Sequence, residues 1–221
     1  MVSRFIKLVS CFLFPNYLKN RWINHIDQTL QLDNFDIDDM SKFLADIVIP
    51  LKPSESIVEL GCHDGKRLAA LKTILSNSKV VFEGIDVNSS VIEFGRLKYK
   101  HLNDFNLEVA DLFDFIKEKE FELVFTYATL MYIHPFKLRA LLESLINQSK
   151  IVVVIEPVTS FKFLTFFPRR NSSYTHNYKN IFKGIIENRN IHLKTIELPK
   201  NLWKPKYGVP YAYIISNNDK F

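Results

Sequence analysis

Residues 56–65, SIVELGCHDG, decide the fold. The apolar run SIVEL leads into glycines at positions 61 and 65, and the helix-like KRLAALKTIL follows at once. Glycines at a strand-to-helix turn let the backbone bend sharply and approach a ligand closely. The spacing matches neither G-x-G-x-x-G nor a P-loop, because the glycines are four residues apart and no hydroxyl residue follows Lys66. The stretch predicts a strand–turn–helix unit, and on its own it also fits an ordinary turn.

The same alternation of apolar runs and helical segments continues along the chain. Runs rich in Val, Ile and Phe occupy 56–61, 80–86, 107–112, 121–128 and 150–158, with helical spacing at 66–77, 88–102, 111–120 and 135–149. Strand–helix alternation predicts right-handed βαβ units and a parallel sheet. A helix at 178–190 and strand-like runs at 192–198 and 211–216 follow, with Pro205 and Pro210 marking a turn. We expect an α/β fold: a doubly wound, mostly parallel, seven-stranded Rossmann-like sheet that ends in an antiparallel hairpin.

Composition fits one globular domain. The 221 residues are 47% hydrophobic and 24% charged, which argues against disorder and repeat arrays. Two cysteines without a zinc-like Cys/His spacing indicate a reducing compartment and no structural metal. We divide the chain into a helical N-terminal extension, residues 1–50, and a domain at 51–221 in which residues 159–178 form a loop that covers the substrate.

The net charge of +5 is unevenly placed, with basic residues near both ends and acidic residues between them. This pattern suggests an anionic partner, or merely solubility. Residues 1–20 have the pattern of an amphipathic helix whose uncharged run is too short to span a bilayer. We expect this helix to pack against the domain or to contact the inner face of a membrane peripherally, and we expect a cytoplasmic protein. The sequence does not indicate an oligomeric state.

Carboxylates follow two further strands of the expected sheet. Ligands of such sheets bind beyond the carboxyl ends of the strands. Asp86 ends the second strand, where it can accept hydrogen bonds from ribose hydroxyls, and Asp111 ends the third, where it can accept one from the amine of adenine. Either acid alone also fits a helix cap. Together with the glycine turn they favour a nucleoside site.

On these residues the chain resembles the class I S-adenosylmethionine-dependent methyltransferases over roughly residues 50–160. That family's first loop reads D/E-x-G-x-G-x-G; here the middle glycine is His63. ELGCHDG, LVFT, IHP and SKIVVVIEPV are similar, more narrowly, to a bacterial branch associated with glycan and surface-polysaccharide loci. The resemblance implies methyl transfer, S-adenosyl-L-methionine as cofactor, and a cofactor site made of Glu59, Gly61, Cys62, His63, Gly65, Asp86, Val87, Asp111, Leu112, Thr126 and Tyr127.

The segment after the fourth strand bears on the methyl acceptor. It reads TYAT at 126–129, without the [D/N/S]-P-P-[Y/F] of enzymes that methylate amino groups of bases, and neither cysteine lies in a Pro-Cys pair. These absences leave an oxygen acceptor or an amine on a small molecule. As the best acceptor we take a hydroxyl of a sugar, sugar nucleotide or surface-glycan component. Two alternatives stay open: an RNA methyltransferase, favoured by the basic tail, and a non-catalytic nucleotide-fold binding protein, favoured by His63.

Methyl transfer to a hydroxyl needs a general base, for which the candidates are His134 and His176. His134 precedes Pro135 and also fits a helix-start histidine bonded to backbone. The polar, aromatic stretch after the fifth strand suggests a substrate site, with a solvated loop as the alternative. The expected substrate-binding residues are Tyr132, Glu156, Arg169, Arg170, Tyr174 and Tyr178.

Overall fold

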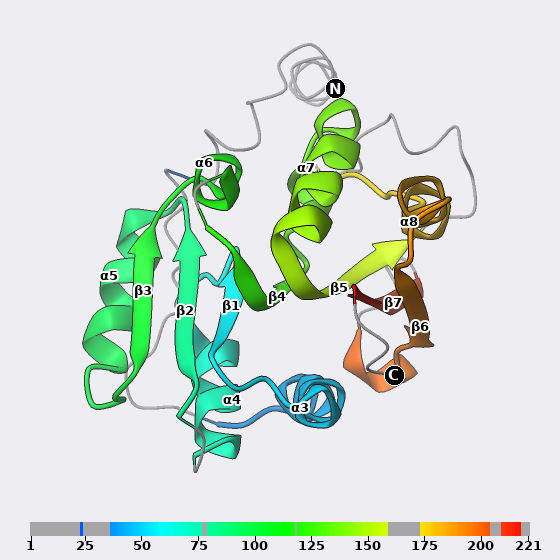
Figure 1. Ribbon diagram of the computed structural model, residues 1–221. Helices are drawn as coiled ribbons and strands as arrows, with labels where there is room; N and C mark the ends of the chain where they lie inside the picture. Colours follow the sequence, from blue (N-terminus) through cyan, green and yellow to red (C-terminus); the bar gives the residue numbers. More distant parts are fainter. Residues whose placement is uncertain are drawn as a thin grey trace.

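Short runs of β-branched and aromatic residues form the strands of one sheet (Figure 1). The computed structural model describes residues 23, 36–76, 79–117, 119–158, 173–203 and 209–217. Its strands are β1 Ser56–Leu60, β2 Val81–Asp86, β3 Phe105–Val109, β4 Phe121–Tyr127, β5 Ser149–Val158, β6 His192–Glu197 and β7 Val209–Ser216. Its helices include α3 Asp39–Leu51, α4 Lys66–Ile74, α5 Ser89–Lys98, α6 Leu112–Lys117, α7 Pro135–Gln148 and α8 Tyr178–Ile186, with 3-10 turns η1 Leu130–Tyr132 and η3 Lys200–Leu202.

The seven strands lie in the order β3-β2-β1-β4-β5-β7-β6. Strands β1 to β5 pair in parallel, and β7 is antiparallel to both β5 and β6. The sequence prediction of a mostly parallel doubly wound sheet with a C-terminal antiparallel hairpin is confirmed. The strand order reverses between β1 and β4, which is where such sheets bind ligands.

Helices cover both faces of the sheet, so neighbouring residues of the central strands face two different cores. Ile57 packs with α3, α4 and α5, whereas the next residue, Val58, packs with α6, α7 and α8. The same alternation holds for Val153 and Val152 of β5. Strands buried on both faces explain why these runs are almost continuously apolar.

The end of the third strand differs from the one expected. The third strand was predicted at 107–112 but β3 ends at Val109, so Asp111 lies beyond the strand. The Asp111 carboxylate accepts a hydrogen bond from the backbone N–H of Phe113 (2.8 Å), and this bond helps to start α6 at Leu112.

The described part of the N-terminal extension is mainly α3, whose Leu44 and Val48 are fully buried in the core. The amphipathic helix expected over residues 1–20 and the turn expected at Pro205 lie outside the described residues. None of the described helices is long and apolar enough to cross a membrane.

Candidate functional site

A cavity of about 520 Å³ lies at the reversal of strand order, beyond the carboxyl ends of β1 to β4. Of the residues singled out from the sequence, nine line it: Gly61, His63, Asp86, Val87, Asp111, Leu112, Tyr127, Tyr132 and His134. They come from four different strand ends, and the strand order of the sheet brings them together. The cavity therefore joins the glycine turn and both carboxylates in one concave site of the kind that binds small ligands.

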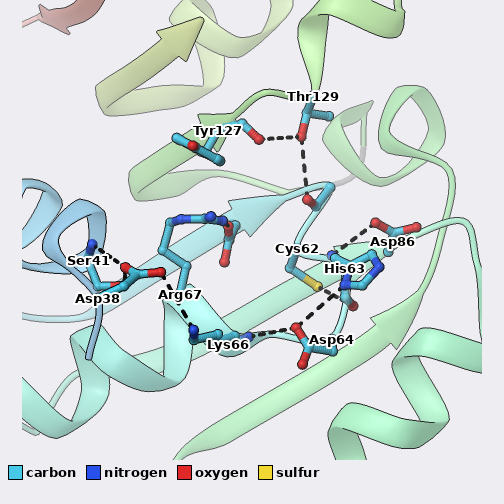
Figure 2. A network of polar contacts seen from close by, with 12 residues as sticks. Asp38, Ser41, Cys62, His63, Asp64, Lys66, Arg67, Asp86, Tyr127 and Thr129 are labelled. Carbon is cyan, nitrogen blue, oxygen red and sulfur yellow. Dashed lines mark hydrogen bonds and ion pairs between the residues drawn. The ribbon is translucent and has the colours of Figure 1, made fainter. Parts of the chain in front are cut away.

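The glycine turn is locked between two strand ends. The backbone N–H groups of Gly61 and Cys62 both donate to the carbonyl of Ile85 (2.8 Å each). Gly61 has φ +72°, and a Cβ there would collide with the side chain of Thr129. The hydroxyl of Thr129 donates to the Gly61 carbonyl (3.4 Å), as Figure 2 shows. Gly61 thus supplies both a left-handed conformation and room for the segment after β4.

His63 occupies the position where the resembling family has its middle glycine. Its φ of +55° lies in the left-handed region that glycine favours. The backbone N–H of His63 donates to Asp86 Oδ2 (3.0 Å), and its Nδ1 lies 3.5 Å from Asp64 Oδ1 (Figure 2). The imidazole lines the cavity. His63 therefore replaces the glycine of the pattern without changing the left-handed backbone conformation at that position.

Asp86 ties this turn to the end of β2 (Figure 2). Its Oδ1 accepts a hydrogen bond from the N–H of Asn88 (3.0 Å) and its Oδ2 accepts the one from His63. The N-cap of α5 is Asn88, whose side chain accepts from Ser90 and Val91. Asp86 is therefore not the cap, and because a carboxylate has about four acceptor sites, it retains capacity for ligand hydroxyls in the cavity.

Arg67, which the sequence analysis did not single out, supplies a cation to the cavity wall. Its guanidinium carbon lies 3.7 Å from the ring centroid of Tyr127, and its Nη1 lies 3.6 Å from Glu59 Oε1. Glu59 is only 1% exposed and does not line the cavity. Burial raises the pKa of Glu59 to about 8, against the attraction of Arg67. A carboxylate buried inside an apolar strand needs a charged or hydrogen-bonding partner. Glu59 within the run SIVEL was therefore the one feature of the sequence that indicated a basic partner such as Arg67.

Three other residues expected to bind cofactor lie behind the cavity wall. Cys62 is buried, and burial raises the pKa of its thiol well above the ordinary value. Gly65 has φ +78° and begins α4, where a Cβ would press on Leu107. Thr126 is fully buried at the end of β4. These residues shape the site without lining it.

The structure corrects the roles expected of residues 173–178. His176 is 1% exposed and lies between the rings of Tyr174 and Tyr178, at centroid distances of 5.8 and 5.5 Å. Burial lowers the pKa of His176 to about 3. Both tyrosines are buried as well, and none of these three side chains lines the cavity. A bridge between His176 and Val158 draws the segment into the core, which its polar composition did not indicate.

Glu156 also differs from its expected role. It is fully buried at the end of β5 and does not line the cavity. Its carboxylate accepts hydrogen bonds from the backbone N–H groups of Thr129, Leu130 and Met131, at 2.7, 2.7 and 3.3 Å. Burial raises the pKa of Glu156 to about 8, although these bonds act in the opposite direction. Arg169 and Arg170, the other expected substrate residues, lie outside the described ranges.

His134 begins α7, as the alternative interpretation held. Its Nδ1 accepts a hydrogen bond from the backbone N–H of Phe136 (3.4 Å), and Pro135 follows as the first helical residue. The neutral ring then carries its proton on Nε2. His134 lines the cavity while its Nδ1 serves the helix.

Within the described ranges, no group of three or more His, Cys, Asp or Glu side chains is placed to hold a metal ion.

No protein-family model matches the chain, and no curated protein matches it. Solved structures match it in fold. The magnesium protoporphyrin IX methyltransferase ChlM from Synechocystis PCC 6803, with bound SAH, is 11% identical with a TM-score of 0.62, over 98% of this chain and all (100%) of that one. The plantazolicin methyltransferase BpumL, in complex with SAH, is 15% identical with a TM-score of 0.61, over 98% of this chain and 96% of that one.

The bifunctional kinase-methyltransferase WbdD is 18% identical with a TM-score of 0.58, over 82% of this chain. The match spans only 40% of WbdD. At these identities the likeness shows the fold alone. Strand order, the antiparallel β7 and these neighbours agree that the chain has the Rossmann-like fold of the class I methyltransferases.

Proposed function

We propose that this protein transfers a methyl group from S-adenosylmethionine to a small-molecule acceptor. One observation carries the proposal: a single cavity gathers the glycine turn, Asp86 and Asp111 at the reversal of strand order in a methyltransferase fold. The complexes of ChlM and BpumL with SAH agree with this choice of cofactor.

The residues present fit an adenosyl cofactor. Asp86 would accept hydrogen bonds from the ribose hydroxyls, and Asp111 would face the amine of adenine, between the apolar walls Val87 and Leu112. Arg67 would meet the carboxylate of the amino-acid part. The close approach of Gly61 to Thr129 leaves no room for a side chain at the turn.

The cofactor supplies an electrophilic methyl group on a sulfonium. The protein must hold an acceptor in line with that methyl group, which contributes roughly 7–11 kcal/mol in well-oriented reactions. As acceptor we propose a hydroxyl of a sugar, sugar nucleotide or surface-glycan component. The support is the TYAT sequence at 126–129, which lacks the motifs of base-methylating enzymes, and the local resemblance to the polysaccharide-locus branch.

Isothermal titration of the full chain with S-adenosylhomocysteine tests the cofactor. We expect saturable binding at one site. Absence of binding at millimolar ligand would contradict the proposal and favour the alternative of a non-catalytic nucleotide-fold binding protein. Transfer of radiolabelled methyl from S-adenosylmethionine to a panel of nucleotide sugars, with bulk RNA in parallel, tests the acceptor. Labelling of RNA alone, falling steeply with salt, would favour the RNA methyltransferase alternative.

A further inference from the structure

The segment between β4 and α7 forms one wall of the cavity through Ala128, Thr129, Tyr132, Ile133 and His134. Its regular structure is the 3-10 turn η1, where the N–H groups of Tyr132 and Ile133 donate to the carbonyls of Thr129 and Leu130 (3.0 Å each). Three consecutive N–H groups, from Thr129 to Met131, point to one carboxylate, that of Glu156 on β5. Bonds from three consecutive N–H groups to one side chain hold the backbone more firmly than a single bond would.

The same segment is bonded to the cofactor turn and to the chain beyond β5. Thr129 donates from its hydroxyl to the Gly61 carbonyl at 3.4 Å. The Met131 carbonyl accepts from the backbone N–H of Tyr174 (2.7 Å), and the Tyr174 ring packs edge-on against His134 at 5.5 Å. Glu156 therefore lies behind a wall that touches both the glycine turn and residues 173–178.

We propose that Glu156 is a positioning residue of the site: its carboxylate fixes the backbone at Thr129–Met131, so that Thr129 stays against Gly61 and the cavity keeps its shape. Glu156 itself does not line the cavity and acts only through this segment. The expected change in affinity for S-adenosylhomocysteine rests on the proposed function, whereas the expected change in backbone exchange at 129–131 does not.

The chain offers a matched control at the other edge of the sheet. Glu122, near the start of β4, is also buried and accepts three consecutive backbone N–H bonds, from Ser54, Glu55 and Ser56, at 2.9, 2.6 and 3.1 Å. It lies at the amino end of the strand, away from the cavity lining. A structural role alone predicts equal consequences for both carboxylates, whereas a positioning role predicts a difference.

The experiment compares Glu156→Gln and Glu122→Gln with the wild type, using hydrogen exchange without ligand and titration with S-adenosylhomocysteine. In Glu156→Gln we expect the amides of 129–131 to exchange about tenfold faster or more, and the dissociation constant to rise about tenfold. In Glu122→Gln we expect faster exchange only at 54–56 and an unchanged dissociation constant. The ratio of kcat to KM should follow affinity, with Glu122→Gln at the wild-type value.

Unchanged exchange at 129–131 in folded Glu156→Gln overturns the proposal, as does an equal loss of affinity in both variants. If Glu156→Gln does not fold, Glu156→Asp, which keeps the charge one methylene short, is judged by the same outcomes. If the wild type does not bind S-adenosylhomocysteine, the proposed function fails. Exchange at 129–131 then decides alone whether Glu156 holds the segment.

Discussion

Buried glutamates at the two edges of the sheet have pKa values that are shifted in opposite directions. At the amino edge, burial raises the pKa of Glu122, but hydrogen bonds from Glu55, Ser56 and Ser54 outweigh it and leave the pKa below its ordinary value. At the carboxyl edge, burial dominates and raises the pKa values of Glu59 and Glu156 to about 8. The lowered pKa of Glu122 means that its ionised form stabilises the fold, whereas ionisation of Glu59 or Glu156 costs stability. Such costs are typical of functional sites.

The pH dependence of stability should separate the two edges most strongly. The folded pKa of Glu59, about 8, lies above its ordinary value of 4.5, so the folded state holds the proton more tightly. Stability is therefore lost as pH rises from 4.5 through 8. Glu59→Gln removes this loss, and relative to the wild type it should gain about 4 kcal/mol between pH 5 and pH 9. Urea unfolding at both pH values measures the gain.

Glu122→Gln is the control, because the contribution of Glu122 to stability should depend on pH in the opposite direction. With a lowered pKa, Glu122 stabilises the fold above its ordinary pKa, and this contribution disappears as pH falls through the folded value. The variant should therefore be more destabilised at pH 7 than at pH 3. If the free energy of unfolding of Glu59→Gln depended on pH as in the wild type, Glu59 would not have the raised pKa on which this comparison of the two edges rests.

Replacement by alanine should be harmful at Gly61 in the cofactor turn and favourable at Gly184 in α8. Gly61→Ala forces alanine to φ +72° and drives its Cβ into Thr129, so we expect affinity for S-adenosylhomocysteine to fall by about 2–4 kcal/mol. Gly184→Ala, in α8, gains about 0.5–1 kcal/mol of helix propensity, partly offset because its Cβ lies 3.2 Å from Nη1 of Arg139, whose Nη2 donates to the Gly184 carbonyl (2.9 Å). Calorimetry and thermal unfolding check both. Wild-type affinity in Gly61→Ala would show that the turn does not approach the ligand.

Asp86→Ala tests the carboxylate that lines the cavity. Loss of charge-assisted hydrogen bonds should weaken binding of S-adenosylhomocysteine by about 1.5–3 kcal/mol, measured by titration. Asp114→Ala is the control, since Asp114 is exposed and pairs with Lys117 at 3.3 Å. Equal affinities for Asp86→Ala and the wild type would remove the ribose role of Asp86.

The fold was predictable because its signals are local. Apolar runs such as IVVVIEPV and the turn at Gly61 need no tertiary information to be recognised, and strand–helix alternation leaves few topologies. For the same reason the sequence predicted that Asp86 lines the cavity: a residue directly after a parallel strand must lie at the carboxyl edge.

The remaining site residues depend on contacts that the sequence does not show. Polar and aromatic residues suggested a loop at 159–178 that covers the substrate, but in the described part residues 173–176 are buried and His176 forms a bridge to Val158 of β5. Glu156 ends its strand as Asp86 does, yet its oxygens turn to backbone N–H groups of the neighbouring segment. Arg67 was not singled out from the sequence, and its contacts with Glu59 and Tyr127 place it in the cavity wall. In each case a partner distant in sequence decides the role.

The smallest expected effect concerns His134, which lies at the cavity yet bonds like a structural residue. His134→Asn keeps an N-cap acceptor, so we expect wild-type stability and turnover within tenfold of the wild type. His134→Ala should cost about 1 kcal/mol in thermal unfolding, as should Asn177→Ala at the start of α8, whose side chain accepts from the N–H of Asn180 at 3.2 Å. A fall in turnover of about 10²–10⁴-fold in His134→Asn, with cofactor affinity unchanged, would instead make His134 the general base. Because Nδ1 is already bonded to Phe136, that result would require the proton to leave Nε2 before each turnover, and the pH–rate profile would show it.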